Sequence, residues 1–149
     1  MMKSNYSYYL PIEIWNQCLN INEPDSIAII NQNLEGGIPN IIGELVNLKS
    51  IYILNCNLDG LIPPEIGNLT NLNNLSLTFN ELSGDIPSEI GNLIGIDTLD
   101  LSFNQLSGFI PEEICNVGIP NLNNNKLCPP YPDCISQDDI DSQDTSECP

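Results

Sequence analysis

An Ile-Pro pair closely preceded by glycine recurs through the middle of this chain at a fixed interval. The prolines of the four copies are 24 residues apart without slippage: Pro39, Pro63, Pro87 and Pro111. A period of this length is typical of a solenoid, in which each repeat buries its apolar face only against its neighbours. The repeat therefore constrains the architecture first, and it favours binding or assembly over catalysis.

Composition narrows the partners of this 149-residue chain. Its formal net charge is −17, with 20 acidic residues, three lysines, no arginine and no histidine. Phosphate binding needs a basic surface, so nucleic acid is not expected as a partner, and an anionic membrane surface is disfavoured for the same reason. Cationic partners, neutral glycans and divalent metals remain open. The absence of histidine removes the commonest general base and zinc ligand, which argues against a hydrolase triad.

Membrane insertion is not expected, because no segment approaches the roughly 20 apolar residues of a transmembrane helix. The start of the chain, MMKSNYSYYLPIEIW, also lacks the continuous apolar stretch of a secretory signal. Three explanations stay open: a signal removed before this numbering begins, export by another route, or residence inside the cell.

Alignment of the repeats shows two sets of apolar positions in every unit. The first set includes alternating segments such as Leu75-Ser76-Leu77, which predict short strands with apolar side chains inward and polar ones outward. The second set follows each proline. Strands at the same position of successive coils predict a parallel sheet. The inward positions of three central units are Leu48, Ile51, Ile53 and Leu58; Leu72, Leu75, Leu77 and Leu82; and Ile96, Leu99, Leu101 and Leu106.

One position after each strand carries an amide in most units. Asn80, Asn104 and Asn125 share it, and Gln32 and Cys56 occupy it in the first two units. A side-chain amide both donates and accepts, so it can satisfy backbone groups buried in a turn. We expect the stacked Asn side chains to form a ladder along the coil, with Cys56 as a buried free thiol.

The segment after each glycine predicts a turn onto the opposite side of the coil. Proline suits a first helical position, and the glycine four residues later (Gly43, Gly67 and Gly91) suits a helix exit. Each unit is therefore expected to carry a short helical turn behind the sheet.

These positions resemble the leucine-rich repeat family in its plant-type subclass, whose pattern is LxxLxLxxNxLxGxIPxxIGxLxx. The segment 72–95, LNNLSLTFNELSGDIPSEIGNLIG, matches it at essentially every diagnostic position, and the resemblance covers about residues 24–127. It implies an α/β-type repeat solenoid: a right-handed leucine-rich-repeat coil with a concave parallel β-sheet, short 3₁₀ or helical turns on the convex side, a minor second sheet at LxGxIP, and caps at both ends.

Three regions are expected: an N-terminal cap over residues 1–23, about four 24-residue units plus a shortened last one over 24–127, and a C-terminal cap with an acidic tail over 128–149. The paired-cysteine cap of plant members is absent at the start, where only Cys18 is present. Near the end, Cys115 replaces the repeated glycine, which marks the transition to a cap. The residues expected to cover the first coil are Ile12, Ile14, Trp15 and Leu19.

Four cysteines cluster at the C-terminal end: Cys115, Cys128, Cys134 and Cys148. Four cysteines allow three pairings, and sequence does not choose among them. We favour Cys128–Cys134, closing the Pro-Pro-Tyr-Pro loop, with Cys115–Cys148 pinning the tail, because such staples suit an oxidising compartment. The alternatives are free thiols in a reducing cell and a zinc site, although the tight C-x₂₋₄-C spacing of zinc sites is missing.

The segment 136–147, SQDDIDSQDTSE, is strongly acidic. It could coordinate calcium through Asp138, Asp139, Asp141 and Asp144, but it lacks the glycine and closing glutamate of a recognised calcium loop. We therefore predict a solvated acidic tail, with no metal and no cofactor.

The Asn-x-Ser/Thr sequons at Asn5, Asn68 and Asn74 are glycosylation candidates if the chain passes through a glycosylating route.

The outward residues of the concave sheet are the candidate ligand-binding residues. Phe79 and Phe103 lie one coil apart, about 4.8 Å, which is within stacking reach. Aromatic faces beside small hydroxyl and amide groups suit a peptide or a sugar; alternatively, these residues only solvate the sheet and shield its edge. The full set is Ser50, Tyr52, Asn74, Ser76, Thr78, Phe79, Thr98, Asp100, Ser102 and Phe103.

The predicted function is a non-enzymatic, extracellular or cell-surface recognition module that binds a protein, peptide or glycan through the concave sheet. Plant-type relatives include receptor ectodomains and inhibitors of pectin-degrading enzymes, so the resemblance also implies recognition. The alternative is a structural subunit that self-associates into a surface layer or extracellular fibre, which the negative charge opposes unless cations intervene. An enzyme is not expected, because Asp97 and Asp100 share one strand with no sign of a cleft around them.

Overall fold

The computed structural model describes residues 12–15, 17–19 and 25–149, and the side chains of Ile14, Trp15 and residues 25–149. Most elements are strands and 3₁₀ turns of three to six residues, in keeping with a coil of short period. In chain order they are β1 (Ile12–Ile14), β2 (Gln17–Leu19), β3 (Ser26–Ile30), η1 (Asn40–Glu44), β4 (Ser50–Leu54), η2 (Pro64–Asn68), β5 (Asn74–Ser76), β6 (Ser83–Gly84), η3 (Ser88–Asn92), β7 (Thr98–Asp100), β8 (Gln105–Phe109), η4 (Glu112–Val117), β9 (Lys126–Cys128) and α1 (Gln137–Asp141).

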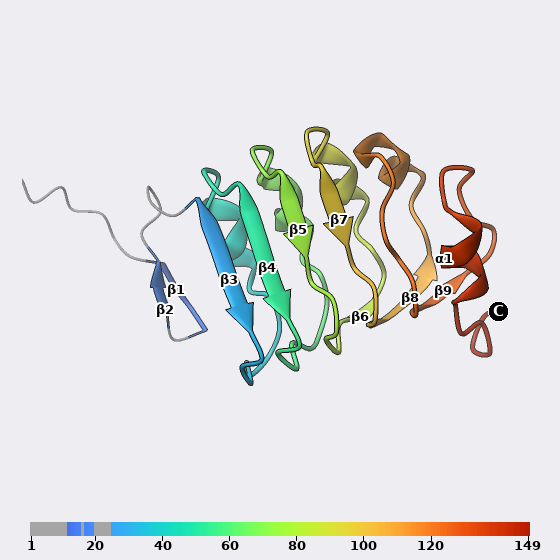
Figure 1. The fold of residues 1–149 in the computed structure, drawn as a ribbon, viewed down its shortest axis with the longest axis horizontal. Coiled ribbons are helices and arrows are strands. Elements are labelled where there is room, and N and C mark those ends of the chain that lie inside the picture. Colours follow the sequence, from blue (N-terminus) through green and yellow to red (C-terminus); the bar gives the residue numbers. More distant parts are fainter. Residues whose placement is uncertain (1–11, 16, 20–24) are drawn as a thin grey trace, which may run out of the picture.

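The repeat strands stack into a four-stranded parallel sheet, called here the main sheet, in the order β3-β4-β5-β7. The register advances by one repeat per strand, so that Ile27 pairs with Ile51 and Leu75 with Leu99. Figure 1 shows these strands side by side along the long axis, with the 3₁₀ turns behind them. The predicted solenoid with a parallel sheet on one side is confirmed.

The predicted inward positions form one continuous core. Leu75, Leu77 and Leu101 are fully buried, and every inward residue predicted for the three central units is buried with them. Each such side chain contributes roughly 1.5–3 kcal/mol of gross hydrophobic stabilisation when fully buried. The coils are therefore held to one another mainly by leucine and isoleucine, as the repeat predicts.

The turns behind the sheet are 3₁₀ helices, and each one follows the proline that recurs every 24 residues. Pro63, for example, precedes η2 in extended conformation. The prediction that glycine ends these helices is wrong: Gly43 lies inside η1, and Leu45 follows the helix. A Cβ added at Gly43 would lie 2.8 Å from the Glu65 carbonyl oxygen of the next coil. Glycine is required there because neighbouring turns pack backbone to backbone.

A second, smaller parallel sheet joins β6, β8 and β9 at the predicted LxGxIP segment. At the N-terminal end β1 and β2 form an antiparallel hairpin. Ile14 is buried in the core and the Trp15 indole donates to the Gly37 carbonyl at 3.1 Å, so these two residues cover the first coil as expected. The side chains of Ile12, Leu19 and Cys18 lie outside the described residues.

Candidate ligand-binding face

The outward face of the main sheet gathers the predicted binding residues in columns, because strands in register place equivalent side chains beside one another. Ser50, Asn74 and Thr98 form one column, and Tyr52, Ser76 and Asp100 form the next. The Asn74 amide donates to the Ser50 hydroxyl at 3.2 Å. The structure therefore brings these residues together on one surface.

Two residues of this face lie deeper than their phase suggests. Ser76 and Ser102 are buried, whereas Thr98 is exposed. The Ser102 hydroxyl lies 2.9 Å from that of Thr78 and donates to the Asp100 carboxylate at 2.6 Å. Ser102 therefore fixes the positions of its neighbours. Thr98, Phe79 and Phe103 are the exposed members of the set, and Ser50, Tyr52, Asn74, Thr78 and Asp100 are half-buried.

Phe79 and Phe103, each three residues after its strand (β5 and β7), form a stacked pair with ring centroids 4.3 Å apart and ring planes 9° from parallel. Their exposed fractions are 54% and 43%, so about half of each side chain faces solvent. Stacking of this kind contributes roughly 0.5–1.5 kcal/mol beyond area burial. The predicted stack is thus present and open to solvent.

The backbone of both phenylalanines is left-handed, with φ of +56° at Phe79 and +53° at Phe103. This region costs an L-residue roughly 1–2 kcal/mol, and asparagine tolerates it better than a bulky side chain does. The equivalent positions in neighbouring coils carry asparagine at positive φ, for example Asn31 and Asn55, whose side chains hydrogen-bond to each other at 2.8 Å. The aromatic pair therefore sits where local conformational preference favours asparagine.

Two further apolar side chains lie on the outward face of β3 and β4, one residue before the phase of this pair, and were not among the predicted binding residues. Ile30 is 52% exposed at the end of β3, and Leu54, half-buried, pairs with it in register on β4. The sequence signal was the break in alternation at Ile29-Ile30, which places an apolar residue at an outward position.

The asparagine ladder joins successive coils under this face. The Asn104 amide oxygen accepts from the Leu82 nitrogen at 3.1 Å, and its nitrogen donates to the Leu77 carbonyl at 2.9 Å. Asn80 and Asn125 make equivalent bonds to the coils before them. All three asparagines are buried, so the ladder stabilises the turns that follow the strands of the main sheet.

The first two predicted ladder positions differ. Cys56 is a buried free thiol whose Sγ contacts the Ile29 and Leu54 carbonyl oxygens at 3.4 and 3.2 Å. The Cys56 backbone carbonyl accepts a hydrogen bond from the Leu34 nitrogen at 2.9 Å. In the later coils the side-chain oxygen of the ladder asparagine accepts this bond instead. Gln32 is exposed, so the ladder does not extend to it; each ladder side chain reaches back to the coil before it, and Gln32 lies in the first coil.

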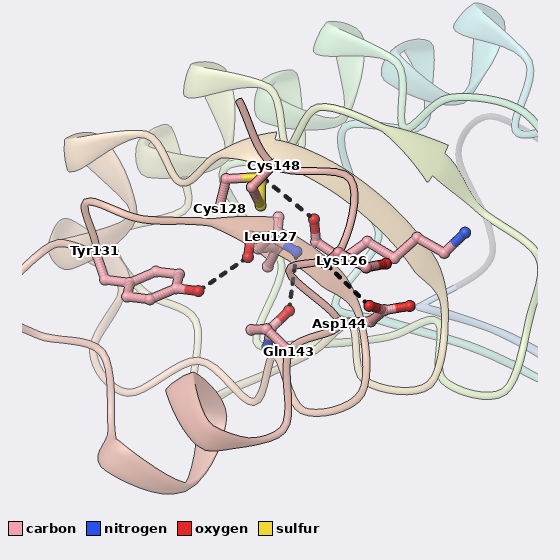
Figure 2. The surroundings of a disulfide bond; sticks show 8 residues. Lys126, Leu127, Cys128, Tyr131, Gln143, Asp144 and Cys148 are labelled. Atoms are coloured by element: carbon pink, nitrogen blue, oxygen red, sulfur yellow. Dashed lines mark hydrogen bonds between the residues drawn. A yellow bond between two sulfur atoms is a disulfide. The ribbon is translucent and has the colours of Figure 1, made fainter.

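The disulfides are Cys115–Cys134 and Cys128–Cys148, so the predicted pairing of these four cysteines is wrong. Cys115 stands in η4 at the phase of the stacking glycines, where no further coil packs against it, and its side chain is free to bond the cap. Cys128 ends β9 and bonds Cys148 where the chain returns past α1, as Figure 2 shows.

The acidic segment folds as part of the cap. Asp138, Asp141, Asp144 and Glu147 are exposed, as the prediction of a solvated segment requires, but Asp139 is buried, which the prediction missed. Ser136 caps α1 by accepting from the Asp139 nitrogen at 3.1 Å, and the Asp139 side chain is only 3% exposed. α1 lies at the end of the solenoid beyond β9 (Figure 1). Within residues 25–149 and the described part of the hairpin, no three Cys, Asp or Glu side chains are grouped to hold a metal ion.

The cap also binds the last strand through side chains. The Gln143 amide oxygen accepts from the Leu127 nitrogen at 3.1 Å, and the Tyr131 hydroxyl donates to the Leu127 carbonyl at 3.0 Å (Figure 2). Burial raises the pKa of the Tyr131 phenol above its ordinary value. Hydrogen bonds from the Ser146 side chain and backbone hold the pKa of the exposed Asp144 below its ordinary value.

The glycosylation candidates differ in accessibility. Asn68 is exposed at the end of η2, whereas Asn74 is half-buried on the main sheet. Asn5 lies outside the described residues. Of the two sites that can be compared, Asn68 is therefore the more accessible.

Comparison with known proteins places this chain in a family. The Leucine Rich Repeat model matches residues 47–69, 71–93 and 95–117. No curated protein matches the sequence significantly. Together with the coil geometry, the repeat matches and the similar solved structures below show that the chain belongs to the leucine-rich repeat family, in its plant type.

Three similar solved structures show the range of relatives. PEPR1 in its complex with AtPEP1 is 34% identical, with a TM-score of 0.73 over 76% of this chain and 16% of PEPR1. The Arabidopsis receptor kinase HAESA, in complex with the peptide hormone IDA and the co-receptor SERK1, is 31% identical, with a TM-score of 0.69 over 76% of this chain and 20% of that one. A plant ice-binding protein is 30% identical, with a TM-score of 0.63 over 83% of this chain and 39% of that one.

The chain thus spans well under half the length of these three proteins. None of the helices in the described part of the structure is long and apolar enough to cross a membrane.

Proposed function

We propose that this protein is a non-enzymatic recognition module that acts outside the cell or at its surface, and that it binds a protein, peptide or glycan on the outward face of the main sheet. The observation that carries the proposal is the solvent-exposed Phe79–Phe103 stack beside columns of hydroxyl and amide groups. Aromatic side chains supply much of the contact energy in binding interfaces, and neighbouring polar groups supply orientation. The proposed contact residues are Ser50, Tyr52, Asn74, Thr78, Phe79, Thr98, Asp100 and Phe103, and the buried Ser76 and Ser102 lie beneath them as positioning residues.

The two disulfides support an oxidising compartment. The similarity to HAESA supports a recognition role, because that receptor kinase was solved with a peptide hormone. The self-assembling alternative has less support, because the C-terminal cap already occupies backbone nitrogens of the last coil, those of Leu122 and Leu127, that an added copy would use.

Binding to peptide and glycan arrays tests the proposal. Thr98 is exposed on the face, so Thr98→Trp adds bulk there without entering the core. Ile94→Trp is the matched control, because Ile94 is 77% exposed in the loop after η3, away from the face. We expect Thr98→Trp to weaken array binding at least tenfold and Ile94→Trp to leave it unchanged.

Three outcomes would overturn the proposal: no binding to either array, binding that only Ile94→Trp removes, or calcium-dependent assembly seen by light scattering in place of ligand binding. Thermal hysteresis measured on the same protein would instead show ice as the ligand, as the similarity to an ice-binding protein suggests.

A further inference from the structure

The Asn68 sequon lies in a turn on the side of the coil behind the main sheet, where Figure 1 shows the 3₁₀ helices. Asn68 ends η2 and is exposed, and Thr70, the hydroxyl residue of the sequon, is also exposed. The Thr70 nitrogen donates to the Asn68 carbonyl at 2.9 Å, so the two residues form one tight turn at the surface. An Asn-x-Thr sequence at the surface of an exported chain is an acceptor for an N-linked glycan.

A hollow of about 400 Å³ lies beside this sequon, between η1 and η2. The Asn68 amide nitrogen faces Gly43 of the preceding coil, because a Cβ added at Gly43 would lie 3.1 Å from that nitrogen. A sugar attached to the Asn68 nitrogen therefore starts at the hollow. The lining residues are Asn40, Ile41, Gly43, Glu44, Glu65 and Asn68.

The hollow contains a hydrogen-bond acceptor that lacks a donor. The Glu65 carboxylate oxygen Oε2 is buried and has no hydrogen-bond partner within the described part of the structure. A buried polar atom of this kind is costly unless a ligand or a water donates to it. The hydroxyl and acetamido N–H groups of N-acetylglucosamine are such donors, and the exposed Ile41 side chain offers apolar contact to a sugar ring.

The Asn74 sequon has a different geometry. Asn74 is half-buried on β5, and its amide nitrogen donates to the Ser50 hydroxyl at 3.2 Å. That nitrogen is therefore directed along the main sheet toward the neighbouring strand, and Ser76, the hydroxyl residue of this sequon, is only 7% exposed. A sugar on Asn74 would separate the Asn74 and Ser50 side chains and cover the outward face.

We propose that Asn68 carries an N-linked glycan whose first N-acetylglucosamine lies in the hollow between η1 and η2 and donates a hydrogen bond to Glu65 Oε2. In the transfer, Asn68 Nδ2 bonds C1 of an oligosaccharide, the diphosphate of the lipid carrier leaves, and Nδ2 loses one proton. The glycan stands behind the main sheet and leaves the outward face open. The inference rests on the proposed location outside the cell and adds a modification site to it.

Isotope labelling tests which sequon is occupied. The full chain, secreted from plant cells behind a cleavable signal, is treated in H₂¹⁸O with a peptide N-glycosidase, which converts each glycosylated asparagine to ¹⁸O-labelled aspartate. Trypsin cleaves after Lys49 and Lys126, so both Asn68 and Asn74 fall in peptide 50–126, and tandem mass spectrometry locates the label. We expect label at Asn68 and none at Asn74. An unlabelled Asn68, or equal labelling of the two, would overturn the inference.

Thr70→Ala and Thr70→Ser test whether the sugar contacts the protein, because alanine removes the sequon and serine keeps it. For the secreted pair, with the glycosylated fraction of Thr70→Ser, we expect Thr70→Ala to melt about 2–4 °C lower, which is the shift of about one hydrogen bond in a chain of this size. The same pair made in a host that forms disulfides but adds no glycan should melt at equal temperatures. Equal melting of the secreted pair would overturn the placement of the sugar in the hollow.

Glu65→Leu tests the proposed acceptor, because leucine fills similar space without an oxygen. With Glu65→Leu in both members of the secreted pair, the difference in melting temperature should disappear. Glu89→Leu is the matched control, since Glu89 is the equivalent residue of the next coil and is exposed, and the difference should persist with it. A difference that survives Glu65→Leu would overturn Glu65 as the contact.

The natural protein, isolated from its source, separates this inference from the proposed function. Bridged cysteines beside an unmodified Asn68 would overturn the glycan and leave the recognition function standing. Free thiols beside an unmodified Asn68 would place the chain in a reducing compartment and overturn both. A glycan on Asn68 in a protein that binds neither array would support this inference and overturn the recognition function alone.

Discussion

The Asp139 carboxylate accepts a hydrogen bond from the backbone nitrogen of Leu122, with 2.7 Å between the two atoms. In the interior of the solenoid the equivalent nitrogen donates to a carbonyl of the next coil, as Leu101 does to Asn121 at 2.9 Å. The Asp139 side chain of the cap therefore replaces the backbone carbonyl that a further coil would provide. Buried backbone donors need such a partner, so this contact ends the solenoid without leaving Leu122 unsatisfied.

Asp139→Ala should lower the free energy of unfolding by about 1.5–3 kcal/mol, because it leaves a buried donor without its charged acceptor. Asp138→Ala is the matched control, since Asp138 neighbours Asp139 in α1 but is exposed; its effect should stay within about 0.5 kcal/mol. Urea denaturation followed by circular dichroism measures both. Equal midpoints for the two variants would show that Asp139 does not hold the end of the solenoid.

The disulfide pairing can be read by double digestion. Trypsin cleaves after Lys126, and an Asp-specific protease cleaves before Asp100, Asp133, Asp138 and Asp144, so each of the four cysteines falls in its own peptide. Mass spectrometry without reduction should show peptide 100–126 linked to 133–137, and 127–132 linked to 144–149. A link between 127–132 and 133–137 would restore the pairing that loop closure alone suggests.

Loss of the Cys115–Cys134 bridge should also destabilise the protein. The bond spans 19 residues, and a loop of this length corresponds to about 3 kcal/mol in the chain-entropy model. The double variant Cys115→Ser/Cys134→Ser, measured by urea denaturation beside the parent, should lose about that amount. An unchanged midpoint would show that this bridge adds nothing to the stability of the cap.

Repetition explains why so much of the fold was predictable. Each inward leucine, such as Leu77, occupies a phase that recurs along the chain, so one unit predicts the environment of the next. The ladder at Asn80, Asn104 and Asn125 was predictable for the same reason. The prediction that Gln32 joins the ladder was wrong, because Gln32 lies in the first coil and has no preceding coil to which its side chain could bond.

Features that occur once were not predictable from the period. The cysteine pairing and the burial of Asp139 depend on the path of the chain after β9, which no repeat specifies. On the main sheet, the spacing predicted that Phe79 and Phe103 stack, but it carried no information on their left-handed backbone. The spacing of the repeat determines which side chains lie beside each other, whereas the backbone conformation of Phe79 and Phe103 is known only from the folded structure.

The pH dependence of the cap should be measurable at Tyr131. Burial raises the folded pKa of this phenol above its value in the unfolded chain, which is about 10. Its contribution is therefore complete below pH 10 and is lost as pH rises through the folded pKa, because the phenolate cannot donate to the Leu127 carbonyl. Tyr131→Phe should cost about 0.5–1.5 kcal/mol at pH 8, and the gap to the parent should shrink at pH 11. A constant gap would contradict the assignment.

The stacking glycines predict a stability difference between two identical substitutions. A Cβ at Gly91 would lie 2.5 Å from the Glu113 carbonyl oxygen of the next coil, whereas a Cβ at Gly95 would meet nothing within 4 Å. Gly91→Ala should therefore destabilise by about 1–3 kcal/mol, because two packed backbones must move apart. Gly95→Ala should be neutral or stabilise by up to about 1 kcal/mol through the unfolded state. Urea denaturation compares the two, and equal effects would mean that coil spacing on this side is not set by glycine.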